Sequence, residues 1–182
     1  MNSLVGPASG RLWPQPLKVT VGGVSRGELA ERLRRQGVSL NAHAETLLAG
    51  PAFDERAGEV MHFVDRTVAE LGLPTGGTLR DVFDAAGVVG LELCPADAAP
   101  YLRLAWTLQA NSTDSLLSMG RSPQGAMKVA SAPLSDDAEY PKGFYLRVVD
   151  GVPWLRGYRC DDEYRFAADD RFAFRAGRVA GP

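Results

Sequence analysis

Apolar positions recur with a helical period in the first hundred residues and alternate with polar positions over short runs in the second half. Two leucine-bearing runs within residues 25–49 share the helical spacing. Ser25 and Glu28 form a capping signature before the first run, and Gly37 is a natural stop after it. The pattern predicts a pair of helices with a very short connection.

Further elements are expected on both sides of this helix pair. Leu17–Val21 has the character of a short strand. Val60–Val68 fits both a helix and a strand, and its β-branched residues favour the strand. Thr78, with Asp81 three positions later, opens another helix over "LRDVFDAAG".

From Tyr101 onward, short apolar runs are separated by Asn, Gly, Pro and Asp, which is the spacing of strands and turns. The chain is therefore predicted to be α+β, with N-terminal helices packed on a C-terminal, mainly antiparallel sheet built from hairpins. Residues 1–16 are expected to be a loose N-terminal arm. Residues 17–182 are expected to form a single α+β domain, helix-rich over 17–100 and strand-rich over 101–178. The runs interpreted as strands are "YLRLAWTLQ", "SLLSMG", "MKVAS", "FYLRVV", "VPWLRGY", "EYRFA" and "RFAFR".

The best-specified element is the hairpin "GFYLRVVDGVPWLRGY". Asp150-Gly151 between two apolar runs predicts a two-residue turn, in which both central residues need a positive φ. A turn of this length also fixes the register of the two strands. The facing pairs are Val149 with Val152, Val148 with Pro153, Arg147 with Trp154, Leu146 with Leu155, Tyr145 with Arg156, and Phe144 with Gly157.

Side chains of the hairpin alternate between two faces. One face is wholly apolar and is expected to lie on the core. The other face is expected to point outward, where arginines and aromatic rings either stabilise each other across the strands or form a recognition surface. Pro153, which has no amide to donate, predicts a sheet edge nearby. The candidate binding residues on the outer face are Tyr145, Arg147, Trp154 and Arg156.

A second hairpin is expected in "YRFAADDRFAFR", with its turn near Ala168–Asp170. It would add arginines to an outer face. Acidic residues beside these arginines nearly cancel their charge, so a polyanion is a poor partner for this part of the chain.

Charge and cysteine content narrow the function classes. A formal net charge of −2 gives no chain-wide electrostatic basis for binding nucleic acid or an anionic membrane. Cys94 and Cys160 are too few for a disulfide framework and are interpreted as free thiols. The absence of a signal peptide pattern and of a long apolar run predicts a cytoplasmic protein without membrane contact.

The helix pair at 25–49 superficially resembles a helix-turn-helix with three arginines nearby, so a DNA-binding regulator is an alternative. Leu33 occupies the place where a small residue usually lets the helices cross. His43 stands where the second helix usually buries a branched aliphatic residue. A plain helical hairpin is the competing interpretation. The arginines are Arg32, Arg34 and Arg35.

Catalytic and metal signatures are weak, and no catalytic residue is assigned. Cys94 precedes a possible helix start at Pro95, where a helix dipole lowers a thiol pKa, and His62 is a conceivable partner for a Cys-dependent enzyme. The acidic clusters "CDDEY" and "ADDR" lack the spacing of a calcium loop and are interpreted as solvated turns, so no metal is expected. No phosphate loop or dinucleotide fingerprint is present, so no cofactor is expected.

Three segments resemble a group of uncharacterised bacterial proteins: "TVAELGLPTGGTLRDVF", "GLELCPADAAPYLRL" and "DDRFAFR". The resemblance covers roughly Glu28 to Arg175. It implies a bacterial, cytoplasmic origin and one coherent unit, and it carries over no activity and no catalytic residues.

The leading functional hypothesis is a non-enzymatic interaction protein. Its expected partner is another protein, or a second copy of itself, bound through the Arg/Trp/Tyr face of the hairpin. The DNA-binding regulator and the Cys94 enzyme are the second and third hypotheses.

Overall fold

The structure is a computed structural model that describes residues 10–112 and 125–177. Along the chain, helices and strands interleave from the first residues onward. The elements are β1 (Leu17–Val21), α1 (Arg26–Arg35), β2 (Ser39–Leu40), α2 (Ala42–Leu48), η1 (Pro51–Phe53), β3 (Glu59–Thr67), η2 (Ala69–Leu71), β4 (Gly77–Thr78), α3 (Leu79–Val88), β5 (Leu91–Glu92), α4 (Ala98–Ala105), β6 (Met127–Val129), β7 (Gly143–Val149), β8 (Val152–Tyr158), β9 (Arg165–Phe166) and β10 (Arg171–Ala176).

One curled, mixed sheet holds most of these strands, in the order β1-β3-β10-β6-β7-β8-β2, with β5 paired to β10 off this path. The β6–β10 and β2–β8 pairs are parallel and the others are antiparallel. The α+β prediction is confirmed. The sheet, however, draws on the whole chain, because β3 from the first half lies between β1 and β10.

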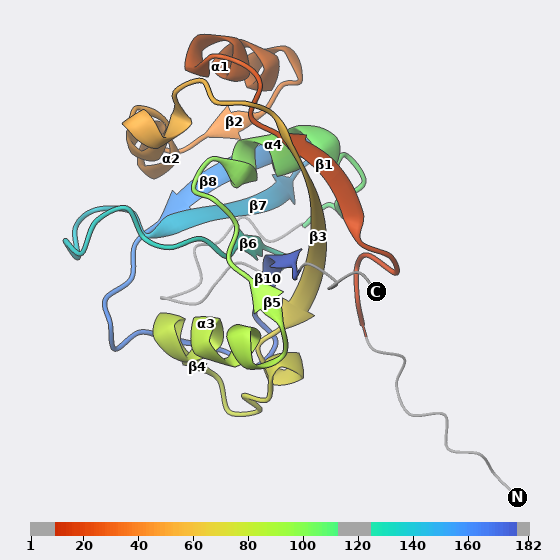
Figure 1. Ribbon diagram of the computed structural model, residues 1–182, viewed down its shortest axis with the longest axis vertical. Coiled ribbons are helices and arrows are strands. Elements are labelled where there is room, and N and C mark those ends of the chain that lie inside the picture. Colours follow the sequence, from red (N-terminus) through yellow and green to blue (C-terminus); the bar gives the residue numbers. More distant parts are fainter. Residues whose placement is uncertain (1–9, 113–124, 178–182) are drawn as a thin grey trace, which may run out of the picture.

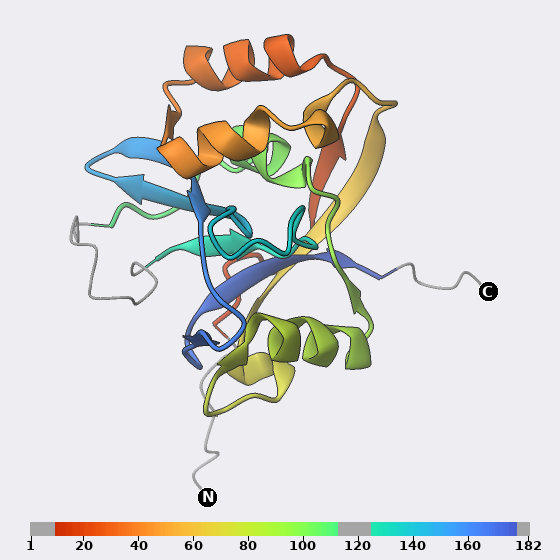
Figure 2. The same ribbon diagram turned by 90° about the vertical axis from the view of Figure 1, so that its left-hand side faces the viewer.

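Helices cover the sheet at two places (Figures 1 and 2). α1, α2 and α4 lie together at one end, and α3 lies at the other end with η2. Two buried apolar clusters match these layers. Ala173 belongs to the first cluster, whereas its neighbours Phe172 and Phe174 belong to the second. Since side chains alternate along a strand, the two clusters lie on opposite faces of β10.

Local sequence signals account for the helix starts. The Ser25 hydroxyl accepts a hydrogen bond from the Glu28 amide at 3.2 Å at the start of α1. Thr78 and Asp81 form a complete capping box at the start of α3. The strand interpretation of Val60–Val68 is also confirmed, as β3.

Two expectations about the elements need correction, and a third is not tested. The run from Tyr101 is the end of helix α4, because the helical turn buries Tyr101 and Leu102 against the first cluster. The helix pair is not joined by a simple turn, since β2 lies between α1 and α2 and pairs with β8. The expected strand "SLLSMG" lies outside the described residues.

The second predicted hairpin is also wrong. β9 pairs with β4, not with β10. Gly76, directly before β4, lies against β9, and a Cβ atom there would stand only 2.2 Å from the Phe166 carbonyl oxygen. The absence of a side chain at Gly76 admits β9 at a distance that other residues would prevent.

Candidate functional site

The β7–β8 hairpin has the predicted turn and register. Asp150 and Gly151 have φ values of 50° and 76°, as the two-residue turn requires. All six predicted facing pairs are present. Leu146 and Leu155 are fully buried in the first cluster, so the apolar face lies on the core as expected.

The opposite face is not an exposed surface, which corrects the prediction. Tyr145 is 7% exposed and Arg147 only 1%. Trp154 and Arg156 are half-buried. Alternation along the strands correctly placed these four side chains together. It could not show that another part of the chain covers them.

Asn111 and Ser112 lie along β7 and explain part of this burial. The Ser112 amide donates to the Val148 carbonyl at 2.8 Å, and the Ser112 hydroxyl accepts a hydrogen bond from Nη2 of Arg147 at 3.2 Å. Asn111 accepts from the Gly151 amide at the turn. No local pattern in the sequence pairs residue 112 with residue 147, so this contact was not predicted.

Within the part of the chain that the structure describes, no carboxylate pairs with the guanidinium groups of this face. Among the described residues, neither Arg147 nor Arg156 forms an ion pair with a carboxylate. The Nε atoms of both are buried without a hydrogen-bond partner. Arg156 stacks on the Trp154 ring, with 4.4 Å between its guanidinium carbon and the ring centroid. A buried cation without a paired carboxylate is costly, and an anionic group that reached these guanidinium groups would offset that cost.

The outer edge of β8 is open only in part. β2 pairs with β8 at Trp154 and Leu155, and the Asn41 side chain then exchanges two hydrogen bonds with the Gly157 backbone. Within the described part of the chain, Pro153 has no ladder partner on this side, which agrees with the predicted edge.

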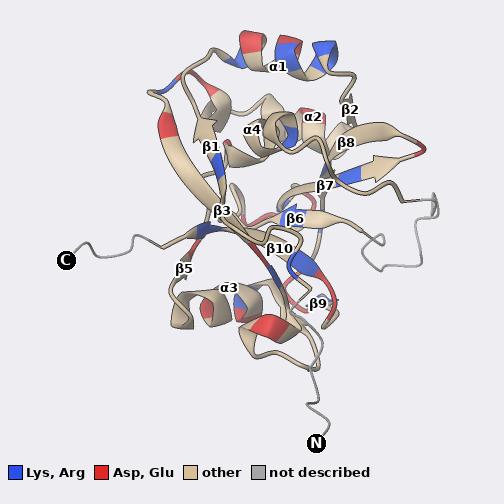
Figure 3. Cartoon of the chain, turned by 90° about the vertical axis from the view of Figure 1, so that its right-hand side faces the viewer, with Lys and Arg blue, Asp and Glu red and all other residues tan. Residues whose placement is uncertain are grey.

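The helix pair offers little support for DNA binding. Acidic and basic side chains alternate along α1 (Figure 3), where Arg32 pairs with Glu28 and both Arg34 and Arg35 pair with Glu31. The sequence of α2, "AHAETLL", contains no lysine or arginine. Leu33 is buried in the first core cluster. The DNA-binding alternative remains a prediction without a basic helix face behind it.

Cys94 does not have the environment of a nucleophile. α4 begins at Ala98, so Cys94 is not at its N-terminus. The side chain is 4% exposed, and burial raises the pKa of the thiol to about 12. His62 is an exposed residue of β3. A nucleophilic thiol needs a lowered pKa, which is the opposite shift.

Side chains of the acidic clusters "CDDEY" and "ADDR" bind other groups of the protein. Asp161 accepts hydrogen bonds from the Glu163 and Tyr164 amides, and Asp170 pairs with the buried Lys128 at 3.1 Å. The described residues contain no group of three or more metal-ligating side chains.

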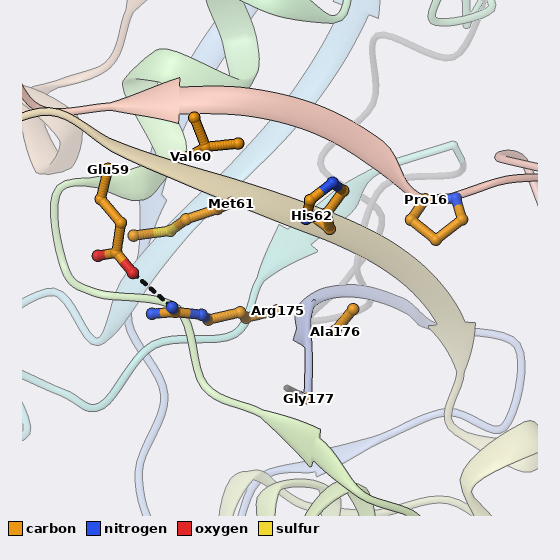
Figure 4. Close-up of a pocket in the computed structure, with 8 residues that line it drawn as sticks. All are labelled: Pro16, Glu59, Val60, Met61, His62, Arg175, Ala176 and Gly177. Atoms are coloured by element: carbon orange, nitrogen blue, oxygen red, sulfur yellow. Dashed lines mark hydrogen bonds and ion pairs between the residues drawn. The ribbon is translucent and has the colours of Figure 1, made fainter. Parts of the chain in front are cut away.

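A second candidate site is an open groove of 610 Å³ at the edge of β3. β3 pairs with β1 over Glu59–Phe63 and with β10 over Phe63–Thr67. Glu59–His62 therefore have a strand partner on one side only, within the described ranges. Figure 4 shows this stretch along one wall of the groove and Arg175, Ala176 and Gly177 opposite it.

Charged side chains bridge the mouth of this groove. The Arg175 guanidinium pairs with Glu59 and, at 3.6 Å, with Glu92. Beside it, Arg56 forms two hydrogen bonds with the buried Asp97 carboxylate, at 2.8 and 3.1 Å. These partners are far apart in the sequence, and no motif links them, so the groove was not predicted.

Comparison of the chain with protein-family models, with curated proteins and with solved structures finds no match. The resemblance to the bacterial group therefore stays a prediction. Among the described residues, no helix is both long and apolar enough to cross a membrane.

Proposed function

We propose that this chain is a non-enzymatic, cytoplasmic interaction protein that binds an acidic segment of a partner protein at the β7–β8 hairpin. The binding residues are Tyr145, Arg147, Trp154 and Arg156.

The unpaired charge of Arg147 and Arg156 is the observation that carries this proposal. Carboxylates of a partner would supply the counter-charges that the described residues do not. Trp154, stacked under Arg156 and half-buried, adds an aromatic anchor of the type that concentrates binding energy. Trp154 and Arg156, which are half-buried, are the part of the site that a side chain or a short segment of a partner can contact directly.

An acidic protein segment fits better than a nucleic acid. The chain as a whole carries a net charge of −2, which opposes the approach of a long polyanion. The unpaired cations are two neighbouring guanidinium groups, a number that matches one or two carboxylates.

The test is a capture experiment with variants of the intact chain, preceded by light scattering to establish its mass. Wild type, Trp154→Ala and Arg156→Gln are cross-linked in a bacterial lysate, and the linked segment of each captured protein is identified. Arg159→Gln is the matched control, because it removes an equal charge from an exposed arginine that already pairs with Glu139.

We expect wild type and the control to capture the same acidic segment and the two site variants to lose it. Capture should also weaken as salt rises. An identical set of partners for all four proteins would overturn the proposal, as would a linked segment without acidic residues. A dimer that Trp154→Ala abolishes would identify the partner as a second copy.

A further inference from the structure

The unpaired edge of β3 points to a second binding site, independent of the hairpin. We propose that the groove beside Glu59–His62 binds an extended segment of a partner protein, which adds to the sheet as a strand next to β3.

The groove-side edge of β3 offers backbone hydrogen-bonding groups. In an antiparallel pair, successive residues direct their N–H and C=O groups alternately to either side. Within Glu59–His62, one set of these groups pairs with β1. The other set points into the groove, where no described strand meets it. Such an edge is a template for a further strand, and its complement is an extended main chain.

The course of β10 explains why Glu59–His62 have no strand partner on the groove side among the described residues. β10 runs antiparallel to β3 as far as the pair Arg175 and Phe63. β10 ends at Ala176, and over its last two residues it also pairs with β5, Arg175 with Glu92 and Ala176 with Leu91. Gly177 is packed so tightly that a Cβ atom there would lie 2.3 Å from the Gly90 carbonyl oxygen. Because β10 ends there, the remaining residues of β3 have no neighbour on this side among the described strands.

The shape of the groove favours a single extended segment as its occupant. The groove is walled on its second side by Arg175, Ala176 and Gly177, as Figure 4 shows. The folded edge of another sheet carries a further strand behind it, so the edge of a second copy does not fit between these walls. A single extended segment, with no sheet attached, does fit.

The side chains that line the groove determine which segments it would bind best. Val60 is 48% exposed beside the slot, and it offers an apolar contact to alternate residues of an added strand. Glu59 and Arg175 face each other across the mouth as an ion pair. The expected segment is thus extended and of mixed polarity, unlike the acidic segment proposed for the hairpin.

The experiment starts with the intact wild-type chain and a displayed library of random, unstructured peptides. Enriched peptides are synthesised, and hydrogen exchange of the protein amides is measured with and without each peptide. Ala176→Trp is the blocking variant, because its ring would fill the groove. Ala42→Trp, at an exposed alanine of α2, is the matched control. Exchange of core amides in each variant verifies that it is folded.

We expect alternate amides within Glu59–His62 to exchange rapidly in the free protein and to become protected when a peptide binds. The affinity should fall at least about tenfold in Ala176→Trp and stay unchanged in Ala42→Trp. The proposal is overturned if no peptide is enriched, if enriched peptides leave these amides unprotected, or if they bind both tryptophan variants equally well. A concentration-dependent dimer that protects the same amides would also overturn it, since the occupant would then be a second copy. Wild-type exchange needs no variant, so a misfolded variant does not remove the test.

Discussion

Replacing Arg147 with methionine should stabilise the ligand-free protein, although the residue is almost fully buried. The substitution keeps much of the side-chain volume and removes the charge. It sacrifices one hydrogen bond, from Nη2 to the Ser112 hydroxyl, and such a bond to a charged group contributes about 1.5–3 kcal/mol. It also removes a buried charge for which the described residues supply no carboxylate, and the desolvation of such an ion costs several kcal/mol.

The desolvation cost that the substitution removes exceeds the contribution of the hydrogen bond that it loses. The free energy of unfolding should therefore rise by about 1–3 kcal/mol in Arg147→Met, within the range found when buried charges are replaced by apolar groups. Lys128→Met is the matched control, because it removes another buried cation of the same sheet that does have a partner. Lys128 pairs with Asp170 at 3.1 Å and lies over two phenylalanine rings. Its loss leaves the Asp170 carboxylate unpaired and should lower the free energy of unfolding by about 2–4 kcal/mol.

Urea denaturation followed by tryptophan fluorescence at neutral pH measures both effects. The free energy of unfolding should change in opposite directions in the two variants, at an unchanged dependence on urea concentration. If Arg147→Met lost as much stability as Lys128→Met, the guanidinium of Arg147 would be a structural group with adequate partners. The hairpin would then have no unused capacity for an anion, and the proposed function would lose its main support.

Three further predictions concern the packing around the proposed sites. Asn41→Ala removes the cap on the Ala44 amide and both hydrogen bonds to Gly157, and urea denaturation should show a loss of about 2–4 kcal/mol. Gly157→Ala would place a Cβ atom 2.7 Å from the backbone of α2, and the free energy of unfolding should fall by about 1–3 kcal/mol. In Gly87→Ala the added Cβ atom meets no atom within 4 Å, and the free energy of unfolding should rise by up to about 1 kcal/mol in the same assay. Because burial raises the pKa of Cys94 from 9.0 to about 12, the folded protein keeps a proton that the unfolded chain releases above that lower value. Relative to Cys94→Ala, the wild-type free energy of unfolding should therefore fall by about 1.4 kcal/mol per pH unit across this window, and a flat difference between the two would contradict the buried thiol.

Short-range signals in the sequence were sufficient wherever one local interaction determines the backbone. Asp150-Gly151 fixed the turn and the whole register of β7 and β8. Ser25 and Thr78 marked the starts of α1 and α3 through hydrogen bonds within three residues. In each case the partner atoms lie close together along the chain, so no knowledge of the fold was needed.

The predictions from the sequence were wrong where a segment far away in the sequence determines the local structure. The alternation in "YLRLAW" suits a strand, yet α4 forms because its helical turn buries Leu102 in a core shared with β1 and β7. β9 joins β4 because Gly76, which has no side chain, leaves room for the Phe166 backbone. The exposure of Arg147 was misjudged because the covering hydroxyl of Ser112 is 35 residues away. Sequence patterns specify which side chains share a face, but not what lies over that face.

Burial of a cation is not by itself a sign of a binding site in this protein, as Arg103 demonstrates. Arg103 is 2% exposed, and burial lowers its pKa to about 10. Both of its terminal nitrogens donate to neutral acceptors, Nη1 to the Gln109 side-chain oxygen at 2.6 Å and Nη2 to the Trp106 carbonyl oxygen, while its Nε is buried without a hydrogen-bond partner, as in Arg147. Lys128 is neutralised by a carboxylate. Arg147 has neither arrangement, since among the described residues Ser112 is its one hydrogen-bond acceptor. An arginine retained only for packing would be expected to resemble Arg103. The two residues differ at Nη1, which in Arg147 has no acceptor among the described residues, and this difference supports the anion site proposed above.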